Sequence, residues 1–183
     1  MFDKLFKPLH YIAISHHEKR WFDLYIPALL SALICLILYF LPTPVVLVGK
    51  DSLIAVVNGI LQILSGFYIA SMAAVATFNK EGMDEVMNGH PPTIKGEALT
   101  RRSFLTYLFG YLAFMSILMY FVGGFLQLAG KSITQISLDL PEIIKYLLVW
   151  LYMLAISNIL TTTVLGMHFL IDRVHRGKSR FTE

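Results

Sequence analysis

Four long apolar blocks alternate with short polar segments along the chain. A helix needs about 20 consecutive apolar residues to cross the hydrocarbon core of a bilayer, and each block is long enough to do so. The sequence predicts these helices at residues 22–41, 52–78, 103–128 and 142–171. It therefore predicts an all-α integral membrane protein, with four transmembrane helices in a single membrane domain.

Shorter segments flank the four blocks. Residues 1–21 place apolar side chains at helical spacing, which is typical of an amphipathic helix lying in the membrane interface. The alternative is an ordinary arm packed on the helix bundle. Residues 79–102 are expected to be the largest loop and residues 129–142 a loop on the opposite side. Residues 172–183 form a basic tail.

The second block carries polar side chains along one line. Asn58, Gln62 and Ser65 stand at i, i+4 and i+7, so they share one face of the predicted helix, which continues as Ile69 and Met72. Our hypothesis is that this face lines a pathway between helices, with the last two residues as a hydrophobic constriction. The alternative is structural, because polar residues in membrane helices often only hydrogen-bond a neighbouring helix.

A second stripe of small residues lies beside the polar face, about a quarter turn away. It consists of Gly59, Gly66, Ala70, Ala73 and Ala74. Small side chains allow the backbones of two membrane helices to come close. The second block is therefore expected to offer a packing face next to its polar face.

Composition agrees with a membrane protein. Of 183 residues, 56% are hydrophobic and 15% are charged, below the roughly 25% charged residues of a typical soluble domain. No segment outside the four blocks is long enough to bury a core of its own. The single cysteine, Cys35, lies inside an apolar run, which excludes an intramolecular disulfide and a cysteine-based metal site.

Basic residues give the orientation. Of the 15 lysines and arginines, only Lys50, Lys131 and Lys145 fall on one side of the predicted spans, and the other twelve fall on the side of both termini. Cytoplasmic segments of membrane proteins carry the excess of positive charge. We therefore expect a multi-pass protein of the cell inner membrane with both termini and residues 79–102 in the cytoplasm.

Catalytic signatures are absent from the sequence. It contains no nucleophile elbow, zinc-protease motif, phosphate-binding loop or paired cysteines, so we expect no catalytic residue, no metal site and no cofactor. His16, His17 and Glu18 are adjacent, and on a helix their side chains diverge. His168 and Asp172 stand at i, i+4, which predicts a local hydrogen-bonded pair or, alternatively, a proton relay.

The spans also lack an ionisable residue at depth. An ion-coupled transporter normally needs such a group near the middle of the membrane, so a passive path lined by amides and hydroxyls is favoured. Four helices pack tightly and leave no lumen among themselves. A conducting path therefore requires several copies of the chain, arranged cyclically.

The basic residues of the cytoplasmic side have several candidate partners. Lys95, Arg101 and Arg102 suit the anionic head groups of membrane lipids. The alternative is a phosphate-bearing ligand of the nucleotide type or an acidic regulatory protein, since arginine makes bidentate contacts with phosphate. These three residues are the predicted ligand-binding or partner-binding site.

The architecture of four spans, cytoplasmic termini and one charged cytoplasmic loop resembles that of small membrane effectors of bacterial antiviral defence systems. The resemblance implies assembly into oligomers that perturb the inner membrane after a cytosolic protein or nucleotide signal. The function we expect is a homo-oligomeric ion channel or pore-forming effector gated from the cytosol. The alternative is a non-conducting membrane anchor or assembly subunit that docks a cytosolic partner, and a lipid-modifying enzyme using the cytoplasmic histidines comes third.

Overall fold

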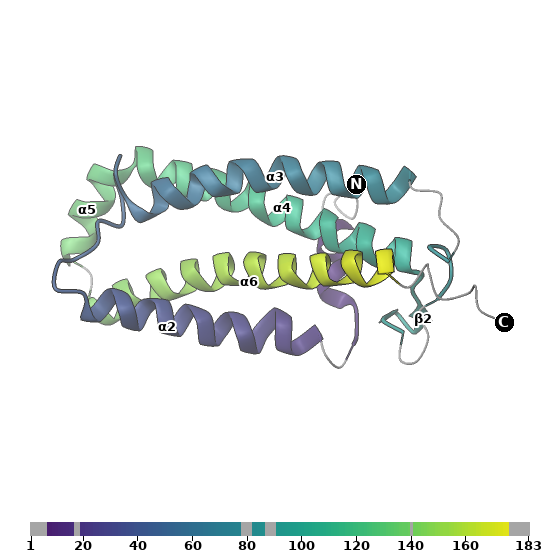
Figure 1. Ribbon diagram of the computed structural model, residues 1–183. Helices are drawn as coiled ribbons and strands as arrows, with labels where there is room; N and C mark the ends of the chain where they lie inside the picture. The colour runs from purple at the N-terminus through teal and green to yellow at the C-terminus, as the bar shows by residue number, and fades with distance from the viewer. Residues whose placement is uncertain (1–6, 17–18, 78–81, 87–90, 140, 176–183) are drawn as a thin grey trace.

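The computed structural model describes residues 7–16, 19–77, 82–86, 91–139 and 141–175 (Figure 1). The chain is mostly helical. The elements are η1 (Lys7–Ala13, a 3-10 helix), η2 (Trp21–Tyr25, a π-helical turn), α2 (Ile26–Phe40), α3 (Leu53–Thr77), β1 (Thr93–Ile94), β2 (Glu97–Ala98), α4 (Arg101–Leu128), α5 (Gly130–Asp139) and α6 (Glu142–His175).

In the described part of the chain, four helical segments are long and apolar enough to cross a membrane. They are Trp21–Phe40, Leu53–Thr77, Arg101–Leu128 and Glu142–Ile171. The four predicted apolar helices are thereby confirmed, with bounds that differ by only a few residues. Pro27 is the second residue of α2, which directly follows the π-helical turn, where the carbonyl oxygens of Phe22 and Asp23 accept from Thr161 and Asn158 of α6. Thr100 caps α4, since its hydroxyl oxygen accepts from the backbone N–H of Ser103 at 3.2 Å.

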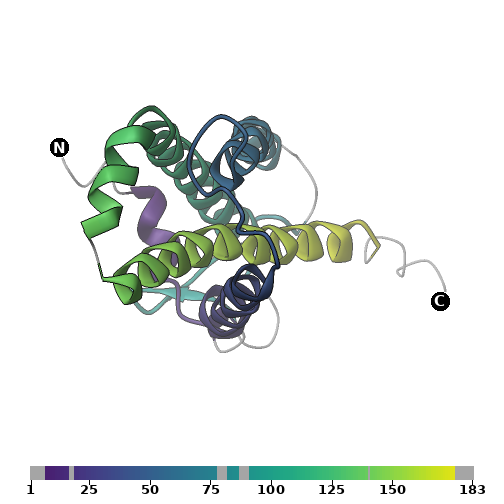
Figure 2. The same ribbon diagram turned by 90° about the vertical axis from the view of Figure 1, so that its left-hand side faces the viewer.

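The helices form two antiparallel pairs. α3 packs along α4 and α2 packs along α6, and the pairs meet where α4 contacts α6 (Figures 1 and 2). We call the end where α3 stops and α4 begins the arginine end, and the opposite end the α5 end. The antiparallel order brings η1, η2, the β1–β2 hairpin and the last turn of α6 to the arginine end.

The core is centred on α4. Its inward face is aromatic and aliphatic, and Leu108, Phe109 and Leu112 are almost completely buried. Gly166 of α6 lies against this face, where a Cβ atom would stand 2.8 Å from Cδ2 of Leu108. Glycine is therefore the residue that allows α6 to approach α4 this closely.

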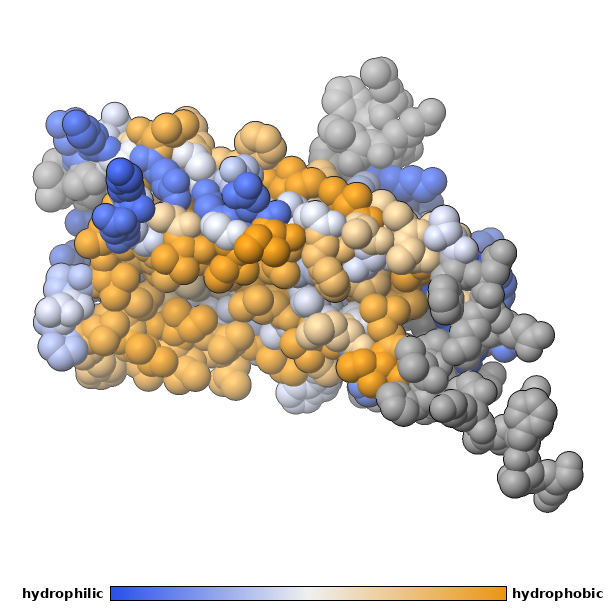
Figure 3. Space-filling model, turned by 45° about the horizontal axis from the view of Figure 1, so that its top comes forward, coloured by the Kyte–Doolittle hydropathy of each residue, from blue (hydrophilic) through white to orange (hydrophobic). Residues whose placement is uncertain are grey.

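The outer surface of the bundle is apolar. Large hydrophobic side chains of all four long helices are exposed, among them Leu29, Ile63, Phe121 and Ile143. Figure 3 shows apolar side chains over most of one face, with hydrophilic residues entering from the α5 end. An apolar belt of this extent suits contact with lipid and would be an aggregation liability in water.

Two segments differ from expectation. Residues 129–142, expected to be a loop, contain the helix α5, which turns back across the end of the bundle. Lys7–Ala13 packs against α4, with Tyr11 and Ile14 buried, as an arm packed on the bundle does. The first six residues of the amphipathic segment lie outside the described residues.

Candidate functional site

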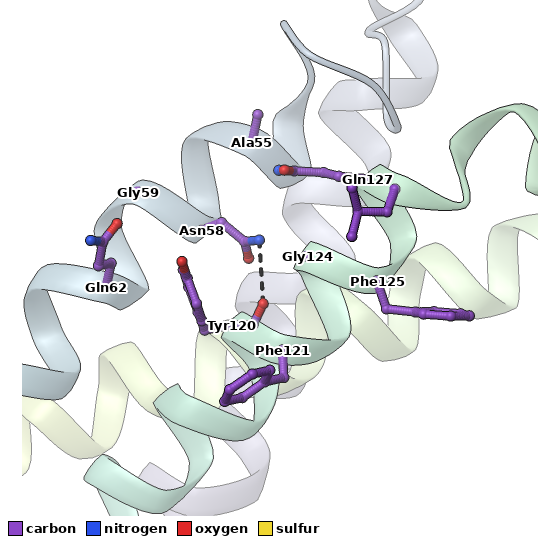
Figure 4. Close-up of a pocket in the computed structure, with 10 residues that line it drawn as sticks. Ala55, Asn58, Gly59, Gln62, Tyr120, Phe121, Gly124, Phe125 and Gln127 are labelled. Atoms are coloured by element: carbon purple, nitrogen blue, oxygen red, sulfur yellow. Dashed lines mark hydrogen bonds between the residues drawn. The ribbon is translucent and has the colours of Figure 1, made fainter.

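A polar groove opens between α3 and α4 on the surface of the bundle, in the half nearer the α5 end (Figure 4). Its volume is about 540 Å³. The lining combines three amides and a tyrosine with small and apolar residues: Ala55, Asn58, Gly59, Gln62, Tyr120, Phe121, Gly124, Phe125, Gln127 and Leu128. We call this the amide groove.

Asn58 lies between the two helices. The side chain is 7% exposed, and its Nδ2 donates to the carbonyl oxygen of Tyr120 at 3.4 Å. Its Oδ1 is buried without a hydrogen-bond partner among the described residues. Gly123 of α4 provides the space, because a Cβ atom there would overlap the carboxamide. Asn58 is therefore both a helix–helix contact and a source of unsatisfied polarity in the amide groove.

Of the other four predicted pore residues, only Gln62 lies at the amide groove. Gln62 is exposed on the rim of the amide groove, and Ser65 donates its hydroxyl hydrogen to the Gln62 carbonyl oxygen of its own helix at 2.9 Å. Ile69 is 47% exposed on the outer surface. Met72 packs partly buried against the core, near Gly110. Only Asn58 and Gln62 of the five line the amide groove.

The stripe of small residues faces outward. A Cβ atom added at Gly59 or Gly66 would meet nothing within 4 Å, and Ala70, Ala73 and Ala74 are exposed. The helix that packs on α3 within the chain is α4, and it contacts a different face. The small-residue face of α3 is consequently open to the surroundings of the chain.

At the arginine end, Arg102 closes the C-terminus of α3. Its Nε and Nη2 donate to the Asp84 carboxylate at 2.7 and 3.0 Å, and its Nη1 donates to the carbonyl oxygens of Val75 and Ala76 at 3.0 and 3.1 Å. A cation is favourable beside the free carbonyls of a helix end. Hydrogen bonding to Arg102 lowers the pKa of Asp84.

The other two predicted binding residues have different surroundings. Arg101 donates to the carbonyl oxygen of Gly82 at 2.9 Å and lies 3.6 Å from the Glu85 carboxylate. Lys95 is exposed at the tip of the β1–β2 hairpin, where its φ of 51° and the φ of 87° at Gly96 form a tight turn. Arg101 and Arg102 thus hold residues 82–86 in place, and Lys95 is the one that points to solvent.

A buried polar cluster at the arginine end was not predicted. Tyr11 is fully buried and donates to Oδ1 of Asp23 at 3.1 Å. Lys19 forms an ion pair with Asp23, and their side chains are only 9% and 19% exposed. The Lys19 ammonium also lies 4.4 Å from the centre of the Tyr11 ring, a cation–π contact. Burial and the negative charge of Asp23 raise the pKa of Tyr11.

The same cluster joins four helical elements. The Tyr11 ring stacks on Tyr111 of α4, with centroids 4.9 Å apart. Tyr111 donates to Oδ1 of Asn158 at 2.7 Å, and Nδ2 of Asn158 donates to the Asp23 carbonyl oxygen at 2.8 Å. η1, η2, α4 and α6 are therefore tied together at one point, which we call the arm latch. The i, i+4 spacing of Lys19 and Asp23 was the available sequence signal, but nothing marked Tyr11.

The geometry of the described residues gives no support for a metal site or for catalysis by histidine. Among the described residues, no group of three or more His, Cys, Asp or Glu side chains is placed to hold a metal ion. His17 and Glu18 lie outside the described residues, as does the side chain of Asp172. His168 is exposed near the arginine end, with its ring 6.0 Å from that of Phe169.

Comparisons with known proteins found no match for this chain among protein-family models, curated proteins or solved structures.

Proposed function

We propose that this chain is the subunit of a homo-oligomeric inner-membrane channel or pore-forming effector, controlled from the cytosol. Both termini and the arginine end face the cytoplasm in this proposal, in agreement with the concentration of basic residues there. The resemblance to membrane effectors of antiviral defence suggests the kind of trigger, a cytosolic protein or a nucleotide-type ligand.

The amide groove is the observation that carries the proposal. In a single subunit, the exposed carboxamide of Gln62 lies on a surface that otherwise faces lipid, beside the buried carboxamide of Asn58. Polar groups without partners in hydrocarbon cost several kcal/mol each, so such positions normally face another helix or water. Assembly of several copies, with the groove turned toward neighbouring subunits or a central path, removes this cost.

The small-residue face of α3 supports assembly at the same place. Gly59 belongs both to this face and to the amide groove, so the two surfaces are continuous. Membrane helices associate through faces of this kind because their backbones approach closely. A neighbouring subunit packed on α3 would bring its own polar residues beside Gln62.

Control from the cytosol is assigned to the arm latch. It joins the N-terminal arm to α4, α6 and the start of the first span through Tyr11, Asp23 and Asn158. Release of the arm would free α4, which carries one wall of the amide groove. A ligand binding the arm in its released state would then shift the population toward an open form.

Ion flux from liposomes holding the purified protein, run beside the mass of the detergent-solubilised particle, tests the proposal. We expect an oligomer, and we expect Gln62→Leu to change the flux without preventing membrane insertion. Gln135→Leu, the same exchange on the exposed surface of α5, is the matched control and should leave the flux unchanged. A non-conducting monomer, with or without candidate nucleotides, would refute the channel.

A second candidate, a non-conducting anchor, is favoured by the exposed hairpin. Lys95 at its tip is free of the internal contacts that occupy Arg101 and Arg102. If the chain is an anchor, the Lys95→Glu variant should lose a cytosolic partner that the wild type retains in a pull-down. Neither protein should conduct ions in liposomes. Substituting the two arginines would be a poorer test, because they hold residues 82–86 and the end of α3.

A further inference from the structure

An apolar cavity of about 600 Å³ lies between the two helix pairs at the α5 end. The connection between α2 and α3, the start of α3, the end of α4, α5 and the first half of α6 all contribute to its wall. Val46, Leu53, Leu126, Ile133, Val149 and Met153 are representative of the lining. The volume is in the range of sites that bind small molecules.

The cavity exists because the pairs are joined at the other end. Gly166 lets α6 approach Leu108 of α4, and Tyr68 of α3 hydrogen-bonds Thr163 of α6. Toward the α5 end α3 and α6 diverge, as Figure 1 shows. The connection after α2 does not fill the space, although it is anchored there by the bond from the Leu53 N–H to the Val46 carbonyl oxygen at 2.9 Å.

Two polar groups in the lining stand out. Lys145 is half-buried near the first turn of α6, and no carboxylate pairs with it in the described part of the chain. Tyr152 lies two turns further along the same face, about 10 Å deeper by the helical rise. Its hydroxyl is buried with no hydrogen-bond partner among the described residues. The cavity thus has a cation at its mouth, and one unpartnered hydroxyl is buried behind its lining.

This combination matches an anionic amphiphile. The apolar wall suits a hydrocarbon chain, and Lys145 stands where a helix of this length enters the membrane, at the depth of lipid head groups. Lysine binds phosphate as a point charge.

We propose that this cavity binds one anionic phospholipid, with an acyl chain between the helix pairs and the phosphate on Lys145. The lipid fills the space between the helix pairs at the α5 end. The proposal stands apart from the channel, since lipid retention is measured without reference to flux or stoichiometry.

Native mass spectrometry of the full chain in mild detergent tests the site, with added phosphatidylglycerol or phosphatidylcholine of identical acyl chains. We expect the wild type to retain one phosphatidylglycerol per chain in preference to phosphatidylcholine. Lys145→Gln should lower phosphatidylglycerol retention about fivefold. Lys131→Gln removes the same charge from the exposed surface of α5, outside the lining, and should change nothing. Excess inorganic phosphate should not displace the lipid.

A second pair of variants tests the cavity itself. Val149→Trp fills the space and should abolish retention of both lipids, whereas Leu147→Trp places the same indole on the exposed face of α6 and should preserve it. Equal retention of the two lipids, or unchanged retention in Lys145→Gln, would overturn the head-group assignment. Retention by Val149→Trp would overturn the cavity as the site, and displacement by phosphate would assign Lys145 to a free anion.

Discussion

At the arginine end, single residues make contacts that their positions in the sequence do not predict. Tyr11 lies in a short arm before the first span, yet it is fully buried and touches Asp23, Lys19 and Tyr111. A buried ion pair is costly unless its remaining polar atoms are bonded. The hydroxyl of Tyr11 provides one of those bonds, so this residue matters to folding as well as to the proposed gate.

Tyr11→Phe removes that hydroxyl and nothing else. We expect a loss of about 1–2 kcal/mol in the free energy of unfolding, because a hydrogen bond to a charged group is lost from a buried site. Thermal unfolding in detergent measures it. Tyr107→Phe is the control, since that hydroxyl has no hydrogen bond in the described part of the chain, and it should be nearly neutral. An equal effect of the two substitutions would contradict the arm latch.

The effect of Tyr11→Phe on the free energy of unfolding should also depend on pH. The pKa of Tyr11 is raised in the folded state, so its contribution to stability is complete below the ordinary pKa of about 10. Above that pH the unfolded chain ionises Tyr11 and the folded chain does not. The difference in free energy of unfolding between wild type and Tyr11→Phe should therefore narrow as pH rises past 10.

At the scale of elements, the sequence predicts the long helices. It predicts only in part which face of each helix packs against a neighbour. The buried seam of α3 runs through Asn58, Leu61 and Tyr68, and the predicted polar face runs through Asn58, Gln62 and Ile69. The two lines share their first residue and then stand one position apart. Periodicity therefore gives a helix and its stripes, but which stripe meets α4 depends on a surface that lies far away in sequence.

The helix α5 and the arm latch were not predicted, for different physical reasons. α5 has ten residues and few apolar ones, so its sequence carries neither the length nor the hydropathy of a span. Its stability depends on the end of the bundle that it covers. The arm latch depends on contacts between residues more than a hundred positions apart, such as that from Asn158 to Asp23, which no local pattern encodes.

The contact between α4 and α6 depends on one glycine. Gly166→Ala places a methyl group against Leu108, which is fully buried and has little room to move. We expect a destabilisation of about 1–3 kcal/mol from overpacking, measured by thermal unfolding. Gly124→Ala on α4, where the nearest atom would be 4.0 Å away, is the matched control and should cost little. Similar losses in both variants would contradict the assignment of the destabilisation to the contact between Gly166 and Leu108.

The whole molecule consists of two helix pairs joined near the arginine end and separated near the α5 end. Because of this asymmetry, three features occupy different places. The arm latch lies at the arginine end, the cavity at the α5 end, and the amide groove on the outside of the α3–α4 pair. The amide groove and the cavity share no lining residue, although α4 contributes to both. Conduction, lipid retention and folding should consequently respond to different substitutions.

Assembly is the prediction that belongs to the whole molecule. Gly66→Leu adds bulk where a side chain would meet nothing within the subunit, so folding of the single chain should be unaffected. If copies pack through the small-residue face of α3, the substitution separates their backbones, and the detergent-solubilised particle should shift to a smaller mass with loss of flux. Ala32→Leu, an equivalent enlargement on the exposed face of α2, should leave the mass unchanged. An oligomer that survives Gly66→Leu would place the subunit contact on another helix, and the amide groove would then face lipid or water rather than a neighbouring α3.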